Sequence, residues 1–160
     1  MNERKPLRLK GYHYGQGGYY FVTVCTKGRR AILSFASVGA GHLAGPTLHL
    51  TARGQMVEEA ILNINAAYPN VSVDKYVVMP NHIHLILRLE QGPAGCPAPT
   101  ELPKILGAWK SLTSRAAGET LWQRSFYDHV IRNEADYLRI WNYIDTNPLK
   151  WTEDEYYIKS

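Results

Sequence analysis

The sequence predicts an α+β domain in which one antiparallel sheet carries helices. Two kinds of segment support this: short β-branched or alternating apolar runs, typical of strands, and longer segments with apolar residues at helical spacing. Their order along the 160 residues is β-α-β-β-α-β-α. The first six elements match the split βαβ, or ferredoxin-like, plan, which places helices on one face of the sheet. We therefore expect the other face to be open to a ligand.

The first half of the chain predicts one helix and three strands. The run YYFVTVCT (19–26) is β-branched and aromatic and indicates a buried strand. The glycine-rich residues 34–46 are expected to form a loop. A helix is predicted over 51–68, because four apolar residues recur there at helical spacing: Val57, Ala60, Ile61 and Ile64. The runs VSVDKYVVM (71–79) and HIHLILRLE (82–90) flank a Pro-Asn turn and predict a hairpin.

The second half predicts two helices around a strand. Residues 92–103 contain four prolines and indicate a loop. A helix follows over 104–117, with an apolar stripe of Ile105, Leu106, Trp109 and Leu112. The run FYDHVI (126–131) predicts a strand, and Asn133 is a candidate N-cap for a last helix over 134–146. The apolar stripe of that helix is Tyr137, Ile140, Trp141 and Ile144.

Composition sets only broad limits on function. The net charge of +4 fits a polyanionic partner but is common in proteins that never bind one. The two cysteines, Cys25 and Cys96, give neither a disulfide framework nor a cysteine-based zinc site. We find no signal peptide and no membrane-spanning run, so a cytoplasmic protein is expected. The prediction is a single domain over 1–160, in which residues 1–18 form a basic arm.

Two histidines one residue apart are the first candidates for chemistry. Because strand side chains two apart point to the same face, His82 and His84 would lie side by side, while Ile83 and Leu85 point into the core. Two neutral imidazoles can bind a divalent metal ion. A motif this short also fits a pair of exposed strand histidines without a ligand, so both interpretations stay open.

Tyr143 and Asn147 are the second pair of candidates. They are four residues apart in the last predicted helix and therefore share a face. Tyr143 lies about 110° from the centre of the apolar stripe, which predicts an accessible hydroxyl at the rim of the core. A phenolate can attack a phosphodiester that is polarised by a metal on His82 and His84, and Asn147 could add an oxygen ligand. The alternative is a tyrosine that merely covers the edge of the core.

The chain resembles the REP-associated tyrosine transposases, a branch of the single-tyrosine transposases with a histidine-hydrophobe-histidine motif. The resemblance rests on MPNHIHLIL (79–87), WQRSFYDHVIRNEADYLRIWNYIDTNPLKW (122–151) and RLKGYHYGQGGYYFVTVCTKGRR (8–30), and it spans nearly the whole chain. The motifs HIH and YIxxNP occur in the family's order. The fold that the resemblance implies, a ferredoxin-like domain with an added C-terminal helix that carries the catalytic tyrosine, agrees with the predicted elements.

The resemblance implies a metal-dependent endonuclease and strand transferase that acts on single-stranded DNA folded into hairpins, such as repetitive extragenic palindromes. Tyr143 would form a covalent 5′-phosphotyrosine and leave a free 3′-OH. His82 and His84 would bind Mg²⁺ or Mn²⁺, with Asn147 at a position where some relatives carry Gln. The glycine-rich stretch 35–50 is longer than the family's pattern. The resemblance leaves open whether the protein is a monomer or a homodimer.

Basic residues predict where DNA would be contacted. Six are candidates: Arg4, Lys5, Arg8 and Lys10 in the N-terminal arm, and Lys110 and Arg115 in the helix over 104–117. A disordered arm and solvated helix charges are the alternative explanations of these residues.

Two other functions compete with a strand transferase. A non-catalytic module could bind a single nucleic-acid strand through the open sheet face, although HIHLILRL (82–89) lacks the aromatic residues that stack on bases. A small metallohydrolase could use the two histidines and a water molecule. That enzyme would not need Tyr143, so the substitution Tyr143→Phe separates it from the transferase.

Overall fold

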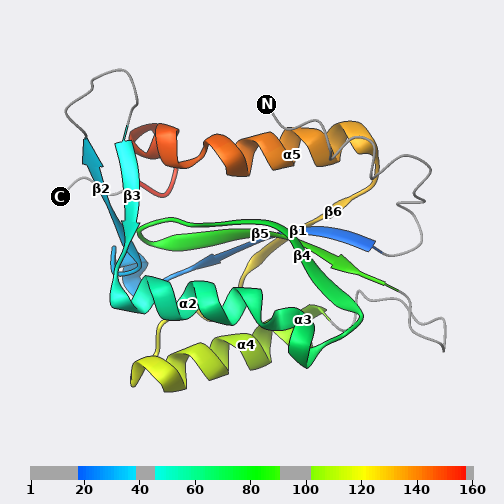
Figure 1. Ribbon diagram of the computed structural model, residues 1–160, viewed down its shortest axis with the longest axis horizontal. Coiled ribbons are helices and arrows are strands. Elements are labelled where there is room, and N and C mark those ends of the chain that lie inside the picture. Colours follow the sequence, from blue (N-terminus) through cyan, green and yellow to red (C-terminus); the bar gives the residue numbers. More distant parts are fainter. Residues whose placement is uncertain (1–17, 39–45, 91–101, 158–160) are drawn as a thin grey trace.

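The computed structural model describes residues 18–38, 46–90 and 102–157 (Figure 1). Its strands are β1 (Gly18–Cys25), β2 (Ser34–Val38), β3 (Pro46–Leu50), β4 (Val71–Val78), β5 (His82–Leu89) and β6 (Tyr127–Ile131). Its helices are α2 (Ala52–Leu62), α3 (Ile64–Ala67), α4 (Leu102–Ala117) and α5 (Glu134–Thr146), with 3-10 turns η1 (Lys27–Arg29) and η3 (Pro148–Glu153). None of these helices is long and apolar enough to cross a membrane. Four predicted DNA contacts lie outside the described residues: Arg4, Lys5, Arg8 and Lys10.

The main sheet has the strand order β4-β5-β1-β6, and each neighbouring pair is antiparallel. This is the order of the split βαβ plan, so the predicted fold class is confirmed. The two central strands, β1 and β5, pair in a register that sets Cys25 opposite His82 and Thr23 opposite His84. The register therefore decides which β1 side chains adjoin the histidines.

One face of the sheet is covered by α2 and α4 (Figure 1). Alternation along β5 sends four residues into this core, as predicted: Ile83, Leu85, Leu87 and Leu89. The predicted stripe of α4 is correct except at Leu112, which is 52% exposed. Thr113 is buried instead, and its hydroxyl accepts a hydrogen bond from Trp122 Nε1 at 2.8 Å. The helix is thus oriented so that Thr113, and not Leu112, faces the core.

The opposite face is covered by α5, so the expectation of a face open to a ligand is wrong (Figure 1). The predicted apolar stripe of α5 is buried there against β1, β5 and β6: Tyr137, Ile140, Trp141 and Ile144 lie on Tyr19, Phe21, Ile86 and Ile131. The side chain of Asn133 accepts from Asp136 N at 2.8 Å, which confirms the predicted N-cap. A site on this face must therefore lie beside α5 and not under it.

A second antiparallel pair, β2 and β3, occupies part of the segment predicted as a loop. That prediction is wrong for 34–38, which pair with 46–50. The glycine signal comes from 39–45, between the two strands and outside the described residues. After β3, Thr51 caps α2 by accepting from Gly54 N at 3.1 Å. A Cβ on Gly54 would lie 1.8 Å from the Leu33 carbonyl oxygen, so only glycine fits this close approach.

Candidate active site

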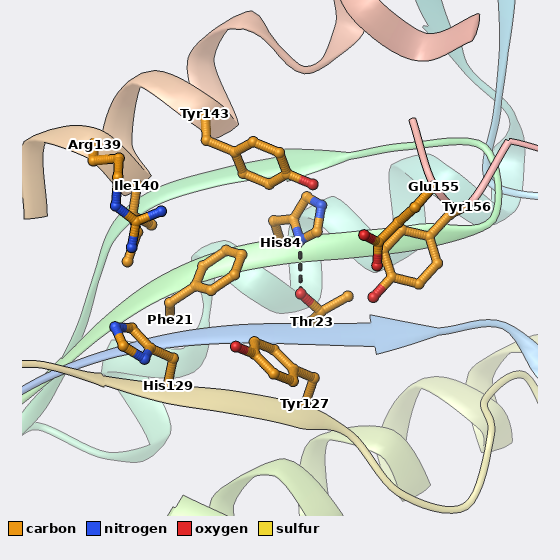
Figure 2. A pocket seen from close by; sticks show the side chains of 10 residues that line it. All are labelled: Phe21, Thr23, His84, Tyr127, His129, Arg139, Ile140, Tyr143, Glu155 and Tyr156. Carbon is orange, nitrogen blue, oxygen red and sulfur yellow. Dashed lines mark hydrogen bonds between the residues drawn. The ribbon is translucent and has the colours of Figure 1, made fainter. Parts of the chain in front are cut away.

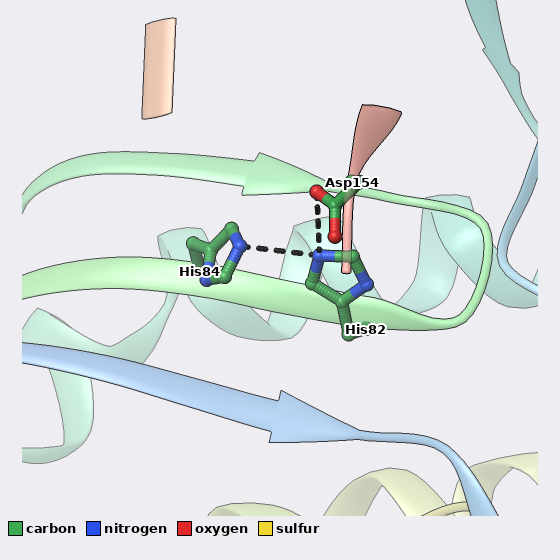
Figure 3. A group of neighbouring side chains, drawn as sticks. All are labelled: His82, His84 and Asp154. Carbon is green, nitrogen blue, oxygen red and sulfur yellow. Dashed lines mark hydrogen bonds and ion pairs between the residues drawn. The ribbon is translucent and has the colours of Figure 1, made fainter. Parts of the chain in front are cut away.

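The histidine pair opens β5, directly after the turn from β4 (Figure 3). His82 and His84 point to the α5 face, and their Nε2 atoms are 3.1 Å apart. Their side chains are 0% and 1% exposed, so the expected projection from an open face is wrong. The segment after α5 folds over them: the rings of Tyr156 and Trp151 lie 4.4 and 6.1 Å from the His82 ring. This cover gives the pair a low-dielectric environment.

Two neighbours hold the imidazoles in position. Asn81 Nδ2 donates to the Tyr156 carbonyl at 2.7 Å, which turns Asn81 Oδ1 toward His82 Nδ1 at 2.8 Å. Because an amide oxygen only accepts, His82 carries its proton on Nδ1 and keeps a lone pair on Nε2. His84 Nδ1 lies 2.8 Å from Thr23 Oγ1, which can donate or accept. When Thr23 accepts, both histidines present Nε2 lone pairs to the same point.

Burial keeps both imidazoles uncharged. It lowers the pKa of His82 to about 2, with further lowering by the charge of His84 when that ring is protonated and by the charge of Arg29. Burial also lowers the pKa of His84 to about 3. Neutral imidazole is the form that ligates metals, so at neutral pH both side chains are ready to do so.

Two oxygen atoms complete the cluster. Asp154 Oδ2 lies 3.9 Å from His82 Nε2, and one ligand atom from each of His82, His84 and Asp154 fits within 4.8 Å of the others (Figure 3). Among the described residues, neither Asp154 Oδ2 nor Asn147 Oδ1 has a hydrogen-bond partner, although both are buried. A buried acceptor without a partner is costly, and a bound cation removes that cost. Two imidazole nitrogens with a carboxylate and an amide oxygen suit a divalent metal ion.

Tyr143 stands on α5 beside this cluster (Figure 2). Its ring centroid is 5.2 Å from that of His84, and the residue is 40% exposed, so its predicted rim position is confirmed. Burial raises the pKa of Tyr143 to about 12, helped by the carboxylates of Asp154 and Glu155 and opposed by the Asn147 amide. The phenol is therefore protonated at neutral pH, and a cation in the cluster would favour its deprotonation.

A cleft of about 430 Å³ lies in front of Tyr143 (Figure 2). Its walls come from α5, from the strands β1, β5 and β6, and from the segment after η3; the lining includes Tyr143, Phe21, His84, Tyr127 and Tyr156. Its volume is in the usual range for small-ligand pockets, roughly 300 to 1,000 Å³. The cleft therefore gives a ligand access to the hydroxyl of Tyr143 and to the edge of the histidine cluster.

The structure does not bring every predicted site residue to this cleft. Lys110 and Arg115 belong to α4, which covers the other face of the sheet (Figure 1). Lys110 Nζ donates to the carbonyls of Arg124 and Ser125 at 3.0 and 3.2 Å, and Arg115 is exposed. Any contact of these two residues with DNA would thus be separate from the histidine cluster.

The sequence interpretation missed several residues at the site, among them Asp154, Asn81 and Arg29. Asp154 lies in an acidic run (153–155) whose spacing from the other candidates carries no recognisable signal. Asn81 was assigned only to a turn, although its place directly before His82 could have suggested a supporting role. Arg29 reaches the site because η1 follows β1, and it lies 5.4 Å from the centroid of the Tyr156 ring.

Similar proteins cover most of the chain. An uncharacterized protein of Haemophilus influenzae is 33% identical, over 99% of this chain and 95% of its own length. The REP-associated tyrosine transposase of Escherichia coli K12 is 30% identical, over 86% of this chain and 70% of that protein. The solved structure of a REP-associated tyrosine transposase bound to a REP hairpin is 28% identical, with a TM-score of 0.63, and covers 85% of this chain and 69% of that one. No protein-family model matches.

The sequence likeness and the structural likeness agree with each other. The α+β fold with its antiparallel sheet is shared with a REP-associated tyrosine transposase of known structure, and the relative from Escherichia coli is matched over more than two thirds of its length. The motifs that first suggested the resemblance, HIH at 82–84 and YIxxNP at 143–148, come together in space beside one cleft. The chain belongs to the REP-associated tyrosine transposase family, and its function is a transposase-like one on DNA.

Proposed function

We propose that the chain is a metal-dependent endonuclease and strand transferase that cuts single-stranded, hairpin-forming DNA with Tyr143 as the nucleophile. One observation carries this proposal: the Tyr143 ring lies 5.2 Å from the His84 ring, at the junction of an open cleft and a buried cluster of metal-ligand side chains. A nucleophile and a site for a cation are thus within reach of the same phosphate.

The proposed cofactor is Mg²⁺ or Mn²⁺. His82 and His84 would bind it through Nε2, and Asp154 Oδ2 and Asn147 Oδ1 would supply the oxygen ligands that otherwise have no partner among the described residues. When bound, such an ion acts as a Lewis acid on a phosphoryl oxygen and offsets negative charge. Asn81 and Thr23 would hold the two rings in the orientation that this role requires.

The chemistry of Tyr143 is a transesterification. Its Oη attacks the phosphorus of the scissile phosphodiester, and the bond from phosphorus to the 3′ oxygen breaks. The phenol releases its proton, and the departing 3′ oxygen takes one up. The products are a 5′-phosphotyrosine and a free 3′-OH, so attack by another 3′-OH can rejoin the strand without an external energy source.

The proposed substrate is a DNA hairpin with a single-stranded flank. The relative of known structure is bound to a REP hairpin. In this chain the cleft lies between α5 and the strands β1 and β6 (Figure 2). A single-stranded backbone bends into such a cleft toward Tyr143 more easily than a duplex does. We therefore expect single-stranded or hairpin DNA to bind more tightly than a blunt duplex of the same length.

Tyr143→Phe tests the nucleophile. Wild-type protein is incubated with Mn²⁺ and a pool of labelled single-stranded oligonucleotides, each with a hairpin between random flanks, and is then analysed on a denaturing gel. We expect a covalent adduct that EDTA abolishes and that Tyr143→Phe does not form, because phenylalanine has no nucleophile.

Tyr76→Phe is the matched control for this test. Its hydroxyl donates to Glu58 Oε1, and its ring packs on the α2 side of the sheet. This variant should form the adduct as wild type does. If Tyr143→Phe still cleaves without an adduct, the enzyme uses water and is a metallohydrolase. If wild type binds the oligonucleotides but never cuts, it is a binding module, and the proposed function is wrong.

A further inference from the structure

The cleft at Tyr143 continues into a second hollow of about 310 Å³. The two spaces share three lining residues: Thr23, Tyr127 and Tyr156. The second hollow extends past Cys25 to Arg29, whereas the first extends the other way to Arg139 (Figure 2). Together they form one groove along β1 and β6, and we refer to it below as the β6 groove. Tyr143 lies along its length and not at its end.

One end of the β6 groove carries a cation from α5. Arg139 is 68% exposed in its side chain and lines the groove together with His129 (Figure 2). Both contact Asp136, His129 at 2.6 Å and Arg139 at 2.5 Å. A guanidinium has five N–H donors, so Arg139 keeps donors for a second anion while one holds Asp136.

The other end carries a cation from the turn after β1. The Arg29 guanidinium is exposed and lies 5.4 Å from the Tyr156 ring centroid, and among the described residues it forms no ion pair. Arg29 has a positive φ of 54°, directly after Gly28 at 68°. A non-glycine residue in this region is strained and is held there by its surroundings. The turn thus places Arg29 at this end of the groove, which its side chain lines.

The middle of the β6 groove has an aromatic ring and one acidic group. Tyr127 is 54% exposed, and the Phe21 ring meets its ring edge to face at 6.1 Å. An exposed aromatic ring in a groove with cations is an arrangement that binds unpaired bases. Glu155 also lines this part and would repel a phosphate that no cation neutralises, so the phosphates that flank the scissile one are expected at the two ends.

We propose that the β6 groove holds one DNA strand on both sides of the bond that Tyr143 cuts. In this arrangement Arg139 and Arg29 each hold one flanking phosphate, and Tyr127 stacks on a base between them. This inference rests on the proposed function for the position of the cut, but it makes a separate claim about the path of the strand. It also differs from the sequence-based expectation, which put helical phosphate contacts at Lys110 and Arg115.

Salt dependence of binding tests the path without cleavage. All variants are made in a Tyr143→Phe background, and binding of a fluorescein-labelled 15-mer of thymidylate is measured by anisotropy over a range of NaCl concentrations. For single strands, the slope of log K against log salt falls by about 0.7 for each phosphate that the protein no longer neutralises. We expect this change for Arg29→Gln and for Arg139→Gln, and about twice this change for the double variant. Tyr127→Leu should weaken binding roughly 5- to 150-fold, with the slope unchanged.

Lys104→Gln is the control, because Lys104 is an exposed cation on α4, on the other face of the sheet. Its slope should match that of the parent. Unchanged slopes for both arginine variants would overturn the strand path, even if wild-type protein forms the covalent adduct. Reduced slopes without any adduct from the wild type would support the groove and contradict the proposed function. The two failures are therefore distinguishable.

Discussion

The two faces of the sheet use the same strands for different purposes. On the α2 and α4 face, β5 contributes Ile83, Leu85 and Leu87 to an apolar core. On the α5 face, the alternate residues His82 and His84 lie among buried polar groups, two of which lack partners among the described residues. The residues on the first face thus stabilise the fold. The buried polar groups on the second face lower the free energy of unfolding, but they form the candidate site. The two buried oxygen acceptors without a partner beside the histidines, Asp154 Oδ2 and Asn147 Oδ1, therefore mark the candidate site on the α5 face.

Among the substitutions that distinguish the two faces of the sheet, His82→Ala should have the largest effect, a loss of DNA cleavage. Loss of one ligand removes the metal's contribution of several kcal/mol to the reaction, so cleavage should fall by about 1,000-fold or more. Wild-type protein should also unfold at a higher temperature in Mn²⁺, because the ion binds only the folded state. At a Mn²⁺ concentration 100 times the dissociation constant, the free energy of unfolding should rise by about 2.7 kcal/mol. His82→Ala should lose this stabilisation, as measured by differential scanning calorimetry.

His49→Ala is the matched control for that variant. His49 is an exposed histidine on β3, where its ring stacks on Phe35 at 5.3 Å. This variant should cut DNA and respond to Mn²⁺ as wild type does. Normal cleavage by His82→Ala in Mg²⁺ would show that the histidine pair holds no catalytic metal.

Gly54→Ala should have the opposite effect: the free energy of unfolding falls, but Mn²⁺ still stabilises the protein. An added Cβ would lie 1.8 Å from the Leu33 carbonyl oxygen, so α2 must shift, at a cost of about 3 kcal/mol. Gly107→Ala in α4 meets nothing within 4 Å and should stabilise the protein by about 0.5–1 kcal/mol. Urea unfolding measures both. Equal effects of the two alanines would contradict the packing described for this face.

Thr23→Val should affect the metal site less than His82→Ala does, and it tests how the His84 ring is oriented. Valine keeps the shape of threonine but removes the hydroxyl 2.8 Å from His84 Nδ1. Removing such a supporting hydrogen bond should weaken Mn²⁺ binding about 10-fold, as measured by calorimetric titration. Thr23→Ser should keep the affinity. Equal affinity of the valine and serine variants would show that Thr23 does not orient the ring.

The sequence predicted the sheet and the histidines but not what covers them. Alternation along 82–89 separated core residues from His82 and His84, and the stripe of α5 was correct. A stripe shows that a helix packs on something, but not on which face, so the role of α5 as a cover was not predictable from periodicity. Thr23 was not predictable because it depends on the β1–β5 register.

Of the two candidate oxygen ligands, one was predictable from the sequence and the other was not. Asn147 follows Tyr143 by four residues in α5, so helical geometry linked them in the sequence. Asp154 comes to His82 only because the chain reverses through η3, and no local spacing encodes that reversal. Local periodicity thus found the parts of the site that lie on regular elements, and missed those brought in by tertiary contacts.

The central claim is that Tyr143 is the residue that becomes covalently bonded to the 5′ phosphate of the cut DNA. Tyr156 is a structural competitor, because its ring lies 4.4 Å from that of His82, and Tyr127 lines the same cleft. Tyr137 is excluded by its position, since it is fully buried and its hydroxyl bonds to Asp74. The decisive measurement is mass spectrometry of the protease-digested adduct formed with Mn²⁺. We predict a nucleotide on the peptide that contains Tyr143, with fragmentation placing it on that side chain; a nucleotide on Tyr156 or Tyr127 would contradict the claim.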